Sequence, residues 1–139
     1  MNKLLIILFI TLLGSSCVLQ KPTNYDNIYN TKWSIITING ISIDEMQNYK
    51  QAELNFSKTD SSYYGNNGCN RIKGKFIVEE NEVSFSQGIS TKRYCEAVDE
   101  QKFYSILSST NSIKLKKKIL LLYKGDLVLA EFQKSHIQD

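Results

Sequence analysis

The sequence is poor in the residues that most often carry catalysis or bind metals. Its 139 residues include one histidine, one proline and three cysteines. The histidine, His136, lies in the polar C-terminal tail, so we expect neither a histidine-based catalytic triad nor a multi-histidine metal site. There is no glycine-rich phosphate-binding loop and no Cys-x-x-Cys pair. These absences predict a protein that is not an enzyme and that has no cofactor.

Positive and negative charges are close to balance. Seventeen basic and fourteen acidic residues give a formal net charge of +3. Proteins that bind nucleic acid through its phosphates need a strongly basic surface. The composition therefore predicts no nucleic-acid partner. We interpret the one basic run, Lys114 with Lys116–Lys118, as an exposed hairpin turn, and the alternative is contact with anionic lipid headgroups.

The N-terminal apolar run is short. Leu4–Leu13 follows a basic start at Lys3 and precedes the small residues 14–16. About ten residues are too few to cross a hydrocarbon layer of about 30 Å as a helix. Basic, apolar and small segments in this order are typical of a secretory signal peptide, here residues 1–16. A buried N-terminal helix is the alternative, but such a helix normally carries polar positions on one face.

The residues around the first cysteine carry a resemblance. Leu13-Gly14-Ser15-Ser16-Cys17 is similar to a bacterial lipobox, in which the cysteine is acylated and becomes the first residue of the mature chain. Gly14 departs from the pattern, which usually has leucine there, and a plain signal peptide cut elsewhere is the alternative. Acyl chains on Cys17 would anchor the protein to a membrane, at about 0.8 kcal/mol for each buried CH₂ group. An aspartate directly after the lipidated cysteine resembles an inner-membrane retention signal. Val18 occupies that position instead, so we expect the outer membrane.

Lipidation of Cys17 would leave two cysteines, Cys69 and Cys95. An even number in an exported protein favours a disulfide bridge. The bridge would close a loop of about 26 residues and stabilise the fold by about 3.5 kcal/mol in the chain-entropy description. Two alternatives stay open, a pair of unpaired structural thiols and a metal or thiol site that includes Glu96.

Short segments of β-branched, aromatic or alternating residues fill most of the remaining chain. Asn39-Gly40 between two such segments is a strong hairpin signal, because both positions of that turn need a positive φ. Only Glu96–Ser108 has the spacing of an amphipathic helix. The pattern predicts an α+β fold, with a curved, mainly antiparallel β-sheet (a partial barrel) and one α-helix.

The chain divides into four parts on this interpretation. Residues 1–16 form the lipoprotein signal peptide, 17–30 a lipidated tether, 31–132 the folded domain and 133–139 a tail. Glycines and asparagines crowd the segment from Tyr64 to Gly74, where we expect Asn67 and Asn70 to stabilise a turn.

Two further groups of residues, one acidic and one aromatic, each allow two interpretations. Glu79, Glu80 and Glu82 can be read as a cation or carboxylate site, but a solvated hairpin turn is the preferred interpretation. The tyrosines beside the cysteines (Tyr63, Tyr64 and Tyr94) can be read as a carbohydrate or peptide surface, but we favour packing in the core or at a sheet edge.

The order of several motifs resembles the META domain family, which includes the heat-shock protein HslJ. The motifs are Trp33 with Asn39-Gly40, Gly65 with Gly68-Cys69-Asn70 and Gly74, the run Thr91-Lys92-Arg93-Tyr94-Cys95, and Glu100 with Phe103 and Leu107. Lys92 and Arg93 depart from the family pattern, which has arginine and methionine at these positions. The resemblance covers residues 31–132.

The resemblance implies an exported, often lipid-anchored domain linked with envelope stress, drug tolerance, motility or secretion, and no shared enzymatic activity. We therefore expect a monomeric, non-enzymatic protein of the cell envelope that is attached to the membrane through its lipid anchor and binds an unidentified envelope protein. The alternative is a binder of a small apolar ligand or lipid within the curved sheet.

Replacement of the lipidated cysteine tests the anchor. We expect Cys17→Ala to abolish metabolic labelling of the protein with palmitate, because the alanine has no sulfur to acylate. Unchanged labelling of the variant would contradict the assignment.

Overall fold

A computed structural model describes residues 24–47, 49–96 and 98–135 of the chain. The predicted signal peptide, the predicted lipidation site Cys17 and His136 lie outside the described residues.

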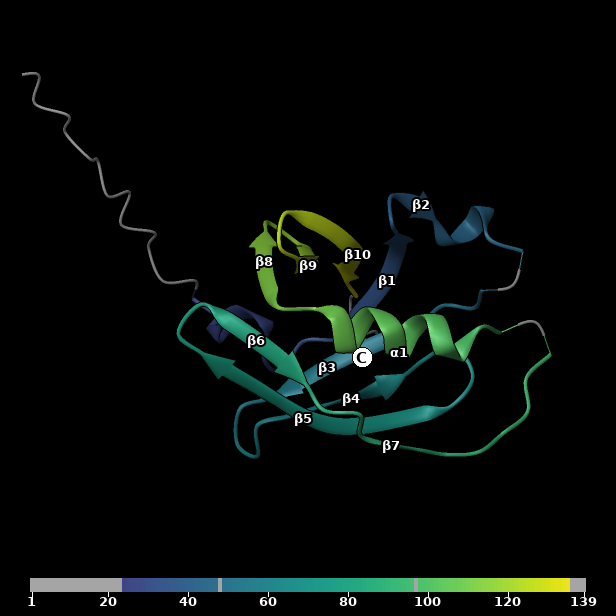
Figure 1. Cartoon of the computed structure of the whole chain (residues 1–139), viewed down its shortest axis with the longest axis horizontal. Helices are drawn as coiled ribbons and strands as arrows, with labels where there is room; N and C mark the ends of the chain where they lie inside the picture. The colour runs from purple at the N-terminus through teal and green to yellow at the C-terminus, as the bar shows by residue number, and fades with distance from the viewer. Residues whose placement is uncertain (1–23, 48, 97, 136–139) are drawn as a thin grey trace, which may run out of the picture.

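Short strands make up most of the regular secondary structure of the described chain (Figure 1). The strands are β1 (Trp33–Ile38), β2 (Ile41–Ser42), β3 (Glu53–Ser57), β4 (Ser62–Asn66), β5 (Arg71–Glu79), β6 (Glu82–Phe85), β7 (Ile89–Ser90), β8 (Ser112–Lys116), β9 (Ile119–Lys124) and β10 (Leu127–Lys134). Two 3₁₀ turns, η1 (Asp26–Ile28) and η2 (Ile43–Glu45), and one helix, α1 (Glu100–Ser109), complete the fold.

The strands form one antiparallel sheet that curves but does not close. Its order is β6-β5-β4-β3-β1-β10-β9-β8, with β2 added to β1 and β7 added to β5. The two outer strands approach each other, since the Val83 amide of β6 donates to the Asn111 carbonyl just before β8 at 2.9 Å. The predicted α+β class, with a curved antiparallel sheet and one helix, is confirmed.

Helix α1 lies across the open side of the curved sheet and contacts β6 and β9 (Figure 1). It buries Phe103, Ile106 and Leu107, which lie on one face at helical spacing. The sequence interpretation started this helix at Glu96, four residues too early. Asp99 ends the preceding loop instead, because its side chain accepts the Lys102 amide at 3.1 Å as an N-cap.

Large apolar side chains fill the concave side of the sheet. Phe56, Phe76 and Phe85 pack on one another with ring centroids 4.7 to 6.2 Å apart. Trp33 and Phe132 from neighbouring strands are also fully buried in this core. Their burial follows from the alternation of strand side chains, which sends every second residue inward.

The turns follow the expected chemistry. Asn39 and Gly40 both have a positive φ, 49° and 79°, as the hairpin prediction requires. Glu80 and Lys117 also adopt a positive φ in the β5–β6 and β8–β9 turns. The glutamate cluster and the lysine run therefore lie in exposed hairpin turns, as preferred from the sequence.

The packed body begins before the predicted boundary at residue 31. Ile28 is buried, and its carbonyl accepts the Trp33 indole N–H at 3.0 Å. The Asn30 amide donates to the Phe56 carbonyl at 3.2 Å. Part of the segment assigned to the tether is thus held against the core, and β10 continues past residue 132 to Lys134.

Gly65 tests how closely β3 and β4 approach. We expect Gly65→Ala to cost about 3 kcal/mol or more in the free energy of unfolding, because its Cβ would overlap the backbone carbonyl oxygen of Glu53. Gly125→Ala is the control, since its Cβ would meet nothing within 4 Å and only the left-handed φ is strained, at about 1–2 kcal/mol. Denaturant unfolding measures both, and an equal loss in the two variants would contradict the packing.

Candidate functional site

The loop between β4 and β5 is organised by its own asparagine. The Asn67 side-chain oxygen accepts the amides of Cys69 and Asn70, at 3.1 and 2.8 Å. The backbone amide of Asn67 donates to the backbone carbonyl of Asn70 at 3.1 Å. Gly68 is required at the tip because φ is +94° and a Cβ would lie 2.8 Å from the Lys50 carbonyl oxygen. The prediction that the two asparagines stabilise this turn agrees with these bonds for Asn67, whereas the side chain of Asn70 bonds to distant residues.

A disulfide bridge fastens the same loop to a distant segment. The structure joins Cys69 to Cys95 with their Cα atoms 5.9 Å apart, across a sequence separation of 26 residues. The bridge occupies both thiols that the alternative metal-site interpretation required. Among the described residues, no group of three or more histidine, cysteine, aspartate or glutamate side chains is placed to hold a metal ion.

Asn70 joins the loop to the segment that leads to Cys95. Its side-chain oxygen accepts the Arg93 amide at 2.7 Å and the Thr91 hydroxyl at 2.8 Å. Its side-chain nitrogen donates to the Arg93 carbonyl at 3.0 Å. The segment around Arg93 has no regular secondary structure, so the side chain of Asn70 supplies the backbone partners that a strand would otherwise provide.

Glu100, the first residue of α1, completes the arrangement. Its carboxylate accepts the side-chain amides of Asn67 at 2.6 Å and of Asn70 at 3.0 Å. We call Asn67, Asn70, Thr91 and Glu100 the asparagine network. Three motifs far apart in the sequence meet in it, and their polar side chains bond to one another and to the backbone of the segments that they join.

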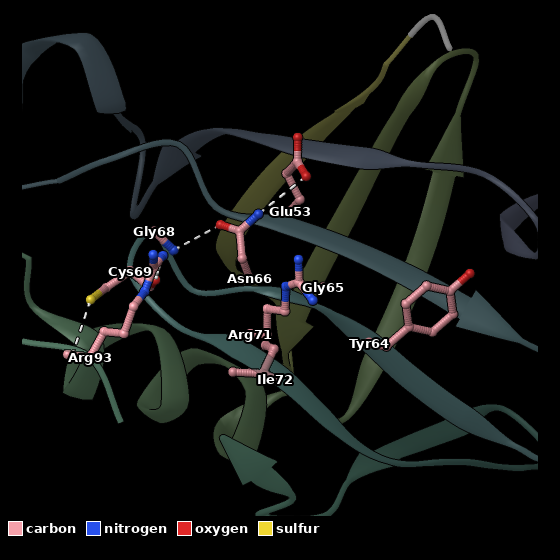
Figure 2. Close-up of a pocket in the computed structure, with 9 residues that line it drawn as sticks. All are labelled: Glu53, Tyr64, Gly65, Asn66, Gly68, Cys69, Arg71, Ile72 and Arg93. Atoms are coloured by element: carbon pink, nitrogen blue, oxygen red, sulfur yellow. Dashed lines mark hydrogen bonds between the residues drawn. The ribbon is translucent and has the colours of Figure 1, made fainter. Parts of the chain in front are cut away.

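A pocket of about 530 Å³ (Figure 2) includes Gly68, Cys69 and Arg93, which are neighbours or bonding partners of the asparagine network. Its lining residues are Glu53, Tyr64, Gly65, Asn66, Gly68, Cys69, Arg71, Ile72 and Arg93. A row of three side chains crosses β3, β4 and β5, because Asn66 is paired in register with Glu53 on one side and with Arg71 on the other. Tyr64 forms the other edge of the pocket and is about half exposed.

Hydrogen bonds fix the polar groups of the pocket. The Asn66 side chain donates to the Glu53 carboxylate at 3.1 Å and accepts the Gly68 amide at 3.0 Å (Figure 2). Glu53 also pairs with Lys32 at 2.7 Å. The Arg93 guanidinium donates to the Cys69 carbonyl at 3.0 Å. The pocket is therefore polar, partly preformed and bounded by the disulfide.

The three tyrosines near the cysteines do not form one surface. Tyr63 is buried in the core, and its hydroxyl donates to the Ser86 carbonyl at 2.9 Å. Burial raises the pKa of this phenol. Tyr94 is 92% exposed, and Tyr64 alone lines the pocket. The interpretation preferred from the sequence was packing in the core or at a sheet edge, and core packing describes Tyr63 only.

Sequence reasoning missed both the asparagine network and the pocket. Glu100 and Thr91 are named in the sequence analysis only as parts of the motifs that carry the family resemblance. The signal available was their position, since Thr91 and Glu100 flank the disulfide cysteine Cys95 at short spacing. Arg71 and Arg93 carry no comparable signal, because the pocket depends on register and loop geometry.

The fold and site define a small α+β domain with a curved sheet and one helix, in which a disulfide joins the β4–β5 loop to the segment before the helix and a polar network joins that loop to the first residue of the helix. The chain belongs to the META domain family, whose model matches residues 26–136. The resemblance seen in the motifs is thereby confirmed.

Solved structures share the fold at low sequence identity. An NMR structure of a protein from Burkholderia xenovorans is 16% identical, covers 85% of this chain and 92% of its own, and has a TM-score of 0.63. A crystal structure of a DUF4847 family protein from Bacteroides vulgatus is 14% identical, covers 81% of this chain and 96% of its own, and has a TM-score of 0.58. No curated protein matches the chain significantly. Within the described residues, no helix is both long and apolar enough to cross a membrane.

The asparagine network predicts a specific defect. Asn70→Asp keeps the side-chain shape but replaces a donor to Glu100 and Arg93 with a second carboxylate. We expect a loss of about 2–3 kcal/mol in the free energy of unfolding near pH 7. The loss should shrink near pH 4, because protonation of one carboxylate removes the repulsion and restores a donor.

Asn55→Asp is the matched control, since the Asn55 amide makes only an exposed 3.3 Å contact with the Tyr64 carbonyl. Its effect should stay within about 0.5 kcal/mol. Chemical unfolding at both pH values measures the two variants. Equal losses, or a loss in Asn70→Asp that does not depend on pH, would count against the network.

Proposed function

We propose that the chain is a lipid-anchored protein of the cell envelope that acts by binding a partner rather than by catalysis. The observation that carries the proposal is what the polar residues of the family motifs contact. Asn67, Asn70, Thr91 and Glu100 bond to one another and to backbone, and they leave an open, polar pocket as the surface beside them. A rigid body with an open pocket suits recognition of another molecule.

The anchor would hold the domain close to the membrane. Acylated Cys17 precedes the first element of the fold, at Asp26, by nine residues. A fully extended chain of that length reaches about 30 Å. The domain is therefore expected within about 30 Å of the membrane surface.

The pocket lies at the end of the sheet away from the tether. Asp26 pairs with Lys58 at 2.7 Å, which puts the start of the fold beside the β3–β4 turn. Glu53, at the other end of β3, lines the pocket. In Figure 1 the described chain begins on the left, whereas the loop between β4 and β5 lies on the right. An anchored molecule would thus present its pocket away from the attachment point.

The alternative function, binding of an apolar ligand within the curved sheet, has less support. The concave side is occupied by the packed rings of Phe56, Phe76 and Phe85 and by the buried face of α1. A ligand there would have to displace well-packed core side chains, at a cost of several kcal/mol. The proposal also includes a link to envelope stress, which the family resemblance suggests. It includes an outer-membrane location, which Val18 suggests.

Site-specific photocrosslinking in intact cells tests the binding role. A photoreactive phenylalanine derivative in place of Tyr64 lies at the pocket edge, and the same residue in place of exposed Leu127 on β10 is the control. We expect one defined covalent adduct from position 64 and none from position 127. Identical adducts from both positions, or none from position 64, would contradict recognition at the pocket.

A further inference from the structure

Arg71 stands out among the basic residues of β5. Arg71, Lys73 and Lys75 alternate along the outer face of this strand. Lys73 pairs with the Asp60 carboxylate at 3.3 Å, and Lys75 donates to the Asp60 carbonyl at 2.9 Å. Hydrogen bonds from Ser57 and Ser62 help lower the pKa of Asp60 to about 2, so this carboxylate stays charged for Lys73. Within the described residues, Arg71 has no such acidic partner.

The second arginine of the pocket is held in place but not neutralised. The backbone of Arg93 is fixed on both sides by Asn70, at 2.7 and 3.0 Å. Its guanidinium uses one donor on the neutral Cys69 carbonyl, at 3.0 Å. Among the described residues, no carboxylate pairs with Arg93 either. Most of its planar donor set therefore stays available.

The acidic residue in the pocket is already balanced. Glu53 is paired with Lys32 at 2.7 Å and accepts the Asn66 amide at 3.1 Å. The two arginines thus leave a net positive pocket. A guanidinium fork matches a carboxylate or a phosphate with paired, charge-assisted hydrogen bonds.

We propose that this pocket binds an oxyanion, a carboxylate or a phosphate, with Arg71 and Arg93 as its ligands. The volume of about 530 Å³ accommodates a molecule larger than a bare ion, and Tyr64 supplies an aromatic wall for its uncharged part. The inference rests on the proposed binding function and adds the chemical class of the ligand.

The position of the pocket favours a soluble anion over the headgroups of the anchoring membrane. The pocket and the start of the fold lie at opposite ends of β3, at Glu53 and beside Lys58. Five strand residues separate these ends by about 13 Å. The start of the fold lies at the Lys58 end, so the pocket lies at the end of β3 that is farther from the attachment point.

The test uses the full chain in nanodiscs of zwitterionic lipid, titrated with inorganic phosphate and, separately, with acetate. Arginine side-chain N–H signals are followed by NMR. We expect saturable shifts for Arg71 and Arg93 with at least one of the two anions. Arg71→Gln should weaken binding about tenfold or more, because a charge-assisted pair is lost. Lys118→Gln removes the same charge from the exposed β8–β9 turn and should change affinity less than about twofold.

The proposal would be overturned if neither anion shifted the arginine signals in a saturable way, or if Arg71→Gln and Lys118→Gln weakened binding equally. A repeat in nanodiscs with anionic lipid identifies the source. Unchanged phosphate affinity supports a soluble ligand, whereas blocked binding would overturn that assignment. The binding measured here does not depend on Cys17 or on a protein partner, so its failure is distinct from loss of the anchor or of the crosslink.

Discussion

The connection between the β4–β5 loop and the start of α1 is the constraint on which the rest of the structure depends. A disulfide joins Cys69 to Cys95, and beside it the amides of Asn67 and Asn70 converge on Glu100. A covalent bond reduces the entropy of the unfolded chain, whereas the side-chain bonds satisfy backbone groups that no strand partner reaches. Because the loop is fixed, Arg93 is fixed, and the pocket has a defined shape.

Much of the fold could be predicted because its strands and turns are encoded locally. Alternating residues identify strands such as β3, and Asn39-Gly40 identifies a hairpin through its positive φ. The helix start was predicted less well, because the amphipathic spacing extends back to Glu96 although the backbone only becomes helical after the Asp99 cap. The early start of the packed body at Ile28 was missed for a similar reason. A single buried isoleucine in a polar segment leaves no periodic pattern.

The candidate site was predictable only in its covalent part. Counting cysteines indicates a bridge between Cys69 and Cys95, which the structure contains. The asparagine network joins residues up to 33 positions apart, and such contacts depend on tertiary structure rather than on local pattern. The pocket arises from strand register, which sets Asn66 between Glu53 and Arg71. A change of one residue in that register would send these side chains to the opposite face.

Amide hydrogen exchange of the oxidised full chain tests the central claim most directly. The Arg93 amide lies in a segment without regular secondary structure and bonds only to the side chain of Asn70, at 2.7 Å. The account predicts protection of this amide comparable to that of β4 amides. Exchange of the Arg93 amide at the rate of an unstructured peptide, while the strands remain protected, would show that the asparagine network does not hold the loop.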